Sequence, residues 1–518
     1  MGKGVSLVLA GVLAAGALVS PDAARGSAAV GDHVLFWGDV LKDAYRVSGG
    51  APGPLARAGA MMHLAVYQAS AGVPGRLGPI NRNVAIDEAA HGVLTAVFNR
   101  TDYPTFSLDL RARYDVARAE AGADPDGWAA AYGRLQADTV VRARADDGWN
   151  DTTPYTPGTE PGAWRETNDA LCVPGKAVTP NWGRVRPFEL TDVASVVPAF
   201  PDGVRTYSQL LGNERYQARV TEVYQYGGAA PTGPADPPTL RAEDQTRIAW
   251  FWANDVNGTY KPPGHMLELT EAVSRVRGLG QAANALLFAE VAVALADASI
   301  ASWHAKYLTP IDLWRPVDAV AVAYPGANWR PLSATSDNRT FSPCFPAWVS
   351  GHASFAGAWE GIMTKWFGEN VDFTATTDDP HAKDQERVFH NFRDAALENA
   401  LSRLYLGVHY RFDAGDGLDL GRAVADRVHG AVTALPAPVE HRVAPGTAVR
   451  TCPGATCAAV VTVDQLGAAG WSFCKKWGRE ADGWWYDVDV YWRGGKFVGW
   501  VPDDRTNLRH SYLGKCVY

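Results

Sequence analysis

The chain has 518 residues, of which 47% are hydrophobic and 20% are charged, and its formal net charge is -8. This length allows a large core and more than one domain, and the composition is that of a globular rather than a disordered protein. The acidic balance, without a basic cluster, excludes the electrostatic footprint of a nucleic-acid-binding protein, so we expect no nucleic-acid partner.

Residues 1–29 have the layout of a secretory signal peptide. Lys3 precedes an apolar run from about Val5 to Val19, and small residues follow as far as Ala29. This run is shorter than the roughly 20 residues that a membrane-spanning helix needs, and an uncleaved anchor is the alternative. We therefore expect a secreted protein, either extracellular or associated with the cell wall.

Residues 30–435 are rich in alanine, with apolar residues spaced three and four apart. This spacing predicts amphipathic or buried helices, as in "PLARAGAMMHLAVYQASAG", "TRIAWFWANDV", "AANALLFAEVAVALADASIASWHAKY" and "NFRDAALENALSRLYLGVHY". Stretches rich in proline and glycine, such as "TTPYTPGTEPGAW" and "GGAAPTGPADPP", predict long loops. The fold class is mainly α, with one large helical-bundle domain.

The character of the chain changes after residue 435. Residues 436–445 form a proline-bearing linker, and residues 446–518 contain short alternating runs such as "WYDVDVYW", which predicts Tyr486, Val488, Val490 and Trp492 on one face of a strand. Gly494-Gly495 then gives a two-residue hairpin signal before "KFVGWV". We expect a small disulfide-stapled β barrel.

The chain has six cysteines, which fit an oxidising compartment. Four of them lie near the C-terminus, and of their three possible pairings we favour Cys452–Cys457 with Cys474–Cys516. The remaining two, Cys172 and Cys344, form either a bridge or two buried thiols. Paired Cys-x-x-Cys spacing is absent, which argues against a zinc site.

Three stretches in the second half of the helical domain concentrate reactive residues. The first is "SWHAKYLTPIDLWRP", with Lys306 and Arg315. The second is "FPAWVSGHASF", with Ser350, Gly351 and His352. The third is "SRLYLGVHYRFD", an otherwise apolar helical stretch with Arg403, His409 and Asp413.

Taken alone, each stretch has an ordinary structural explanation. Lys306 and Arg315 would be surface cations whose stems cover apolar side chains, and Ser350 would be the N-cap of a helix. His409 and Asp413 would be a buried histidine held by a carboxylate. Each of these explanations concerns one stretch, and none accounts for all three stretches together.

Together, the three stretches predict a cradle for a phosphate-like anion. Lys306, Arg315 and Arg403 supply fixed positive charges, and arginine forks match the oxygens of a tetrahedral oxyanion. The Ser350 hydroxyl and the amides at the following helix start add donors, and Gly351 allows close approach of the backbone.

Two histidines complete this predicted site. His409 would contact the central atom of the anion, as nucleophile or metal ligand, with Asp413 holding its other ring nitrogen. His352 would act as general acid or base, because a histidine pKa is useful near neutral pH.

These motifs resemble those of the superfamily of type 2 phosphatidic-acid phosphatases (PAP2) and vanadium-dependent haloperoxidases. Ser402-Arg403, five residues, His409, three residues and Asp413 match the pattern of that superfamily without a gap, and Ser350-Gly351-His352 matches with Val349 in the place of a proline. Lys306 and Arg315-Pro316 are separated by eight residues where the superfamily has six. The similarity covers roughly residues 30 to 435.

The resemblance favours the secreted bacterial haloperoxidase-like branch, in which a tryptophan three residues before the lysine lines the site, as Trp303 would here. It implies a vanadate cofactor bound to His409 and held by Lys306, Arg315, Ser350, Gly351 and Arg403, with hydrogen peroxide and a halide as substrates. It also implies a PAP2-like helical fold and leaves a homodimer open.

Two alternatives remain. The first is a PAP2-type acid phosphatase without a metal, which would hydrolyse a phosphate ester through a phosphorylated His409, with His352 protonating the leaving group. The second is a wall-binding protein with a degenerate catalytic domain, because residues 446–518 resemble bacterial SH3-like domains, which often bind cell-wall glycan or peptide.

Overall fold

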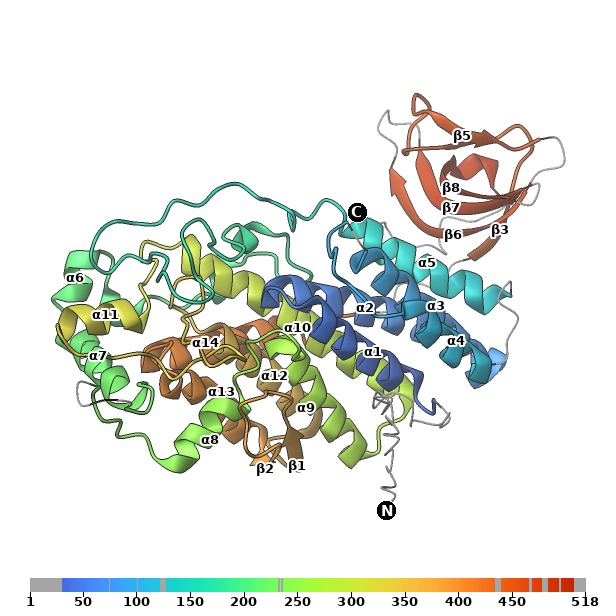
Figure 1. The fold of residues 1–518 in the computed structure, drawn as a ribbon. Helices are drawn as coiled ribbons and strands as arrows, with labels where there is room; N and C mark the ends of the chain where they lie inside the picture. Colours follow the sequence, from blue (N-terminus) through green and yellow to red (C-terminus); the bar gives the residue numbers. More distant parts are fainter. Residues whose placement is uncertain are drawn as a thin grey trace, which may run out of the picture.

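The computed structural model describes residues 30–506, apart from residues 74, 100, 122–126, 232, 234–235, 434–438, 465–467, 478–482 and 493–494. The predicted signal peptide, residues 1–29, lies outside the described residues. Figure 1 shows a large helical part, with helices over residues 33–428, and a smaller body of strands over residues 439–502. The mainly α fold class is confirmed.

Short loops and longer irregular segments connect the helices of the first part. The first group of helices is α1 (His33–Ser48), α2 (Pro52–Gly72), α3 (Gly78–Val97), α4 (Leu110–Ala121) and α5 (Trp128–Ala143). The second group is α6 (Tyr207–Leu211), α7 (Glu214–Tyr226), α8 (Glu243–Phe251), α9 (Lys261–Arg277), α10 (Gln281–Tyr307), α11 (Pro316–Ala323), α12 (Gly351–Phe367), α13 (Phe392–Tyr405) and α14 (Arg411–Val428).

The helix α10 lies at the centre of the bundle, where α2, α12 and α14 pack against it (Figure 1). Among the described residues it is the single helix that is long and apolar enough to cross a membrane, but 94% of its most apolar window is buried inside the protein. Its apolar character on all sides is that of a core helix, because neighbouring helices surround it.

The helices α12 and α14 approach each other closely, and this approach determines where two of the predicted site segments lie. A Cβ atom on Gly421 of α14 would come within 2.2 Å of the Ser354 carbonyl oxygen of α12. Because that distance is shorter than any side chain tolerates, glycine is required there. The N-terminal ends of both helices consequently lie side by side.

A short antiparallel pair of strands, which the sequence analysis did not predict, lies between α12 and α13. β1 (Asn370–Thr376) pairs with β2 (Glu386–Asn391), and alternate residues of β1 are buried. Phe373 and Phe389 are partners across this pair, with ring centroids 5.7 Å apart.

The C-terminal strands form a second body with its own core. They are β3 (Val439–Val443), β4 (Ala448–Arg450), β5 (Ala459–Thr462), β6 (Ala468–Trp477), β7 (Trp484–Trp492) and β8 (Gly495–Pro502). Their order in the antiparallel sheet is β3-β6-β7-β8-β4-β5. The predicted burial of Tyr486, Val488 and Val490 on one face is confirmed. Closure into an SH3-like barrel stays a prediction.

Two details of this β region differ from the sequence analysis. The strand β3 lies within residues 436–445, which were predicted to be a linker, because its backbone pairs with β6 over Val439–Val443. The β7–β8 hairpin is confirmed by the pairing of Trp492 with Gly495. Gly495 therefore belongs to β8 and not to the turn.

Two disulfides are present among the described residues. Cys172 is bonded to Cys344, which decides between the two options that the sequence left open, and Cys452 is bonded to Cys457 as predicted. The predicted partner of Cys474, residue 516, lies outside the described residues.

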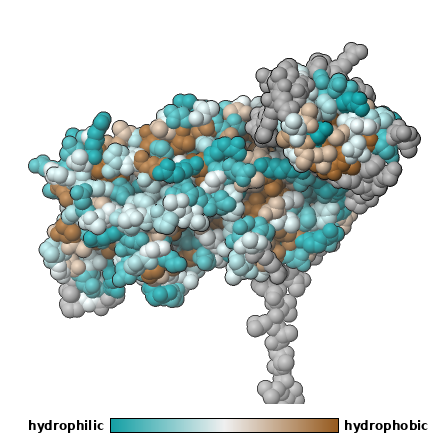
Figure 2. Space-filling view, turned by 90° about the horizontal axis from the view of Figure 1, so that it is seen from above, coloured by the Kyte–Doolittle hydropathy of each residue, from teal (hydrophilic) through white to brown (hydrophobic). Residues whose placement is uncertain are grey.

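On the face seen in Figure 2, hydrophobic residues form small separate patches among hydrophilic ones.

Candidate anion-binding site

Backbone hydrogen bonds bring together the three segments that the sequence analysis singled out. The Ala347 amide donates to the Leu313 carbonyl at 2.8 Å, which joins the first segment to the second. The Ser350 amide donates to the Asp413 carbonyl at 3.0 Å, which joins the second segment to the third. The three segments therefore converge as predicted, although Lys306 and Asp413 are 107 positions apart in the sequence.

We had expected the third segment to be one continuous helix, but the structure divides it between two helices. α13 ends at Tyr405, a turn follows, and α14 begins at Arg411. Gly407 makes this turn with a φ of +76°, and a Cβ atom on it would lie 2.4 Å from the Gly227 carbonyl oxygen. His409 consequently lies in the turn, while Asp413 lies in the first turn of α14.

This turn holds the His409 ring in one orientation. One carboxylate oxygen of Asp413 lies 3.0 Å from His409 Nδ1 and accepts the Tyr410 amide at 3.0 Å. Arg315 Nη1 lies 3.1 Å from His409 Nε2, and an arginine can only donate. The proton of the neutral imidazole therefore lies on Nδ1, and the Nε2 lone pair faces the cations.

Arg315 is fully buried, and it is partly satisfied by the backbone. Its Nε donates to the Phe345 carbonyl at 2.7 Å, and its Nη1 donates to the Val408 carbonyl at 2.7 Å. Its Nη2 is buried without a hydrogen-bond partner. The Phe345 ring covers the guanidinium at 4.7 Å from the centroid.

Arg403 is 1% exposed and makes one ion pair, with Asp255. Its Nη2 lies 2.6 Å from the Asp255 carboxylate, whereas Nε and Nη1 are buried without partners. Asp255 was missed by the sequence analysis, which read "TRIAWFWANDV" as helical. The Asn-Asp pair after the helix was the signal that could have indicated a turn there.

Lys306 is also fully buried, but its ammonium group is occupied. It donates to the carbonyl oxygens of Pro346 at 2.8 Å, Ala347 at 3.1 Å and Val349. An ammonium group has three donors, so all three are used by the segment that precedes α12. The role of Lys306 as a direct ligand of the anion stays a prediction, and in this structure the residue holds that segment in place.

The start of α12 lies where the sequence analysis placed the anion donors. Ser350 is the N-cap and accepts the Ala353 amide at 3.4 Å. Gly351 is the first helical residue, and a Cβ atom on it would meet the Trp303 ring at 3.5 Å. Trp303 is fully buried and donates to the Val178 carbonyl at 3.2 Å, so it lies beside the site as predicted.

His352 differs from the expected acid–base residue with a pKa near neutrality. Burial, and next the charge of Arg403, lower the pKa of His352 to about 3. Its Nε2 lies 2.9 Å from the Ala253 carbonyl, so Nε2 carries the proton and donates. Among the described residues Nδ1 has no hydrogen-bond partner, which leaves it available as a proton acceptor.

The electrostatics of the site favour a bound negative charge. Burial lowers the pKa of His409 well below its usual range, and Arg315, Lys306 and Arg403 lower it further. Burial also lowers the pKa of Lys306 well below its usual range, and the repulsion from Arg315 acts in the same direction. An anion at the centre of these groups would relieve the repulsion and restore these pKa values.

A cavity of about 610 Å³ opens onto this site. Its inner wall contains Trp303, Gly351, His352, Arg403 and His409. The exposed part of its lining comes from the segments between α5 and α6, between α8 and α9 and between α11 and α12, and it includes Leu171, Asn257, Ser336, Asp337 and Arg339. This volume is in the range of small-molecule sites.

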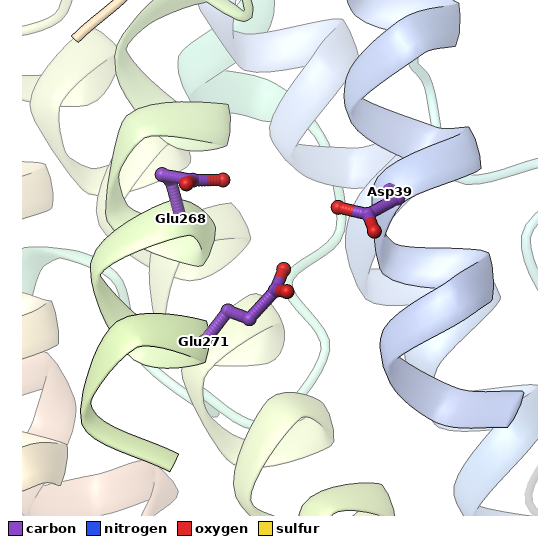
Figure 3. A group of neighbouring side chains, drawn as sticks. All are labelled: Asp39, Glu268 and Glu271. Atoms are coloured by element: carbon purple, nitrogen blue, oxygen red, sulfur yellow. The ribbon is translucent and has the colours of Figure 1, made fainter. Parts of the chain in front are cut away.

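A separate group of carboxylates, Asp39, Glu268 and Glu271, lies between α1 and α9 (Figure 3). Its oxygens are within 4.8 Å of one another, but the Lys42 ammonium lies among them. That ammonium is 2.9 Å from Asp39 and 2.7 Å from Glu271, and it also contacts Glu268. Because the Lys42 ammonium contacts all three carboxylates and Arg275 also pairs with Glu271, we do not assign a cation to this group.

The helical bundle and the buried donors define a class of protein. It is a helical protein in which buried cations lie beside a histidine held by an aspartate, an arrangement that suits a tetrahedral oxyanion. Residues 286–437 match the family model of the second helical-bundle domain of vanadium chloroperoxidase (VCPO). Over these residues the chain is similar to the superfamily of vanadium-dependent haloperoxidases and type 2 phosphatidic-acid phosphatases.

Comparisons with individual proteins find the same kind of relative, and the solved structures share the fold. The chain is 24% identical over 497 residues to the vanadium chloroperoxidase of Curvularia inaequalis, covering 75% of this chain and 80% of that protein. It resembles the structure of the first bacterial vanadium-dependent iodoperoxidase, with a TM-score of 0.64, 23% identity and coverage of 77% of this chain and 96% of the other. It also resembles the structure of the holo-type bacterial vanadium-dependent chloroperoxidase, with a TM-score of 0.60, 17% identity and coverage of 77% of this chain and 97% of the other.

Proposed function

We propose that this protein is a secreted vanadium-dependent haloperoxidase. The observation that carries the proposal is a set of buried guanidinium N–H groups without partners, on Arg315, which contacts Nε2 of His409, and on Arg403, which lines the same cavity as His409. Buried donors are nearly always satisfied, and unsatisfied ones at one place indicate a missing ligand. Vanadate and phosphate are both tetrahedral oxyanions of the required charge.

The residues of the site fit vanadate. His409 would supply the nitrogen ligand through Nε2, because Asp413 keeps the proton on Nδ1. Arg315, Arg403, the Ser350 hydroxyl and the Gly351 amide would bind the oxygens. When bound, vanadate supplies a Lewis acid that keeps its oxidation state while it activates hydrogen peroxide.

The reaction would be X⁻ + H₂O₂ + H⁺ → HOX + H₂O, in which the halide loses two electrons and the peroxide is reduced. His352 would take the proton that hydrogen peroxide releases, because the residue lines the cavity and its Nε2 is already bonded, which leaves Nδ1 as the acceptor. The buried rings of Trp303 and Phe355 limit water around the site. Lys306 would contribute its positive charge without touching the anion, because its ammonium group is bonded to the backbone segment before α12.

The phosphatase alternative uses the same groups. A neutral, buried His409 could also attack phosphorus through Nε2 once the contact from Arg315 shifts to the anion, and His352 could assist the second step. The relatives that the chain resembles favour the peroxidase, because they are vanadium haloperoxidases. The retained set of buried donors supports an enzyme over a degenerate domain.

Secretion is part of the proposal. The Cys172–Cys344 and Cys452–Cys457 disulfides support it, since such bonds persist in oxidising compartments. Attachment of residues 446–518 to cell-wall glycan or peptide is a further proposal. Sedimentation of the full chain with purified cell walls would test it, and equal recovery in the supernatant with and without walls would contradict it.

One preparation of metal-free protein tests the choice between the two reactions. One part is loaded with orthovanadate and assayed for halogenation of a phenol-type dye with peroxide and bromide, and the other is assayed on a phosphomonoester. We expect halogenation without phosphatase turnover, and the reverse result would favour the alternative. His409→Ala should abolish turnover, whereas His390→Ala, at an exposed histidine paired with Asp372, should retain it.

A further inference from the structure

Lys261 is a buried cation at the active-site cavity that the proposed mechanism does not use. It is the first residue of α9, it is 4% exposed, and it lines the same cavity as His352, Arg403 and His409. Neither the motifs nor the sequence analysis pointed to it.

The positive charge of Lys261 has no carboxylate in direct contact among the described residues. Its Nζ donates to the backbone carbonyl of Asp255 at 2.6 Å, while the carboxylate of that residue is bound to Arg403. Lys261 and Arg403 therefore lie on two sides of one residue, Asp255. A buried charge without an opposite charge in contact is costly, and an anion in the cavity would offset the cost.

The backbone around Lys261 holds the side chain in place. Its φ is +60°, which is uncommon for a residue other than glycine. The preceding Tyr260 is fixed by its amide on Asp378 at 3.0 Å and by its hydroxyl on the Thr376 carbonyl at 2.9 Å. Such a conformation persists only where its surroundings determine it, so the ammonium group is preorganised.

The surroundings of Lys261 select a small anion of low charge. Pro262 and Pro263 follow it and have no amide hydrogens, so the helix start offers few additional donors. The cavity lining includes the apolar Val256, Pro262 and Phe355 as well as the polar Asp255 and Asn257. One ammonium beside apolar side chains suits a monovalent, weakly hydrated ion. A multiply charged oxyanion instead needs the several donors that Arg315 and Arg403 offer.

Lys261 is charged under ordinary conditions. Burial lowers its pKa to about 8, and the carboxylates of Asp255 and Asp379 oppose that shift. At neutral pH most of the population therefore carries the ammonium form.

We propose that Lys261 binds the halide ion in the cavity before the halide reaches the oxidation site. The inference rests on the proposed peroxidase function, because the halide is the substrate anion of that reaction. Bromide and iodide should occupy this position more readily than chloride, since the smaller ion is more strongly hydrated and loses more on entering a partly apolar site.

Bromide soaked into crystals of the full-length, vanadate-free protein gives a direct test, because bromide is located by its anomalous scattering. We expect a peak in contact with Lys261 Nζ in the native protein and in Lys261→Arg, and no peak there in Lys261→Met. A peak that persists in Lys261→Met, or that lies only elsewhere, would mark an adventitious ion and overturn the proposal.

Kinetics give the second measurement. Loss of one charge-assisted contact should raise the KM for bromide about 10- to 100-fold in Lys261→Met, with kcat and the KM for peroxide changed less than about threefold. An unchanged KM for bromide would contradict the proposal. Arg339→Gln is the matched control, because Arg339 lies at the exposed cavity rim and is already paired with Asp337 at 2.8 Å.

The two proposals can fail separately. If the native protein binds bromide at Lys261 but does not oxidise it, the anion position stands and the peroxidase function is wrong. If it oxidises bromide but shows no ion at Lys261, the function stands and this inference is wrong. The thermal midpoint of each variant is measured alongside, and the conservative Lys261→Arg variant remains informative if Lys261→Met does not fold.

Discussion

Replacing Arg403 by methionine should weaken the binding of a tetrahedral oxyanion by several orders of magnitude. Two buried N–H groups of Arg403, on Nε and Nη1, have no partner in the protein and would bind oxygens of the anion. A hydrogen bond that involves a charged group contributes about 1.5–3 kcal/mol, so two of them contribute about 3–6 kcal/mol. At about 1.4 kcal/mol per factor of ten, the Kd should rise about 10²- to 10⁴-fold.

Titration calorimetry with orthovanadate and with inorganic phosphate measures this Kd. Because Arg403→Met leaves the Asp255 carboxylate without its partner, the double variant with Asp255→Asn separates lost binding from lost stability. Arg403→Lys keeps a charge but loses the planar fork, so its Kd should fall between those of the native protein and Arg403→Met. A folded Arg403→Met variant whose Kd lies within about threefold of the native value would refute the proposed anion site.

Three further predictions concern the surroundings of the site. Gly407→Ala should destabilise the protein by about 2–5 kcal/mol in urea unfolding, because the φ is +76° and the new Cβ would meet the Gly227 carbonyl. Burial raises the pKa of Asp416 to about 6, above its unfolded value, so its ionisation costs stability. That cost is absent below about pH 4 and complete above about pH 6, and Asp416→Asn should therefore stabilise the protein by about 1–3 kcal/mol at pH 8 but not at pH 4. Removing the disulfide with Cys172→Ala and Cys344→Ala should cost about 2–5 kcal/mol and weaken phosphate binding.

Each of these predictions has its own control. Gly415→Ala places a methyl group where no atom lies within 4 Å, so it should be neutral or stabilising, and an equal loss of stability in both variants would contradict the account of Gly407. For Asp416, a thermal midpoint whose change is the same at both pH values would contradict the raised pKa. For the disulfide, unchanged phosphate affinity in the double variant would contradict the expected effect of the bond on anion binding.

The sequence predicted much of the fold because helical spacing is a local property. The apolar period over α2 and α10 is visible without knowledge of their neighbours, and the structure confirms both helices. The break after Tyr405 was not predicted, because the apolar residues continue through the turn. Its cause is the close approach of Gly407 to Gly227, which are far apart in the sequence.

The sequence by itself determined the chemical types of the site: two arginines, a lysine, two histidines and an aspartate at recognisable spacings. Only the tertiary structure decided how their hydrogen bonds are distributed. Lys306 has its donors used by three carbonyls, Arg315 and Arg403 keep free ones, and Lys261 joins the cavity without any motif. The physical reason is that spacing along the chain reports periodicity, whereas the partners available to a buried charge depend on which distant backbone atoms the fold brings within about 3 Å.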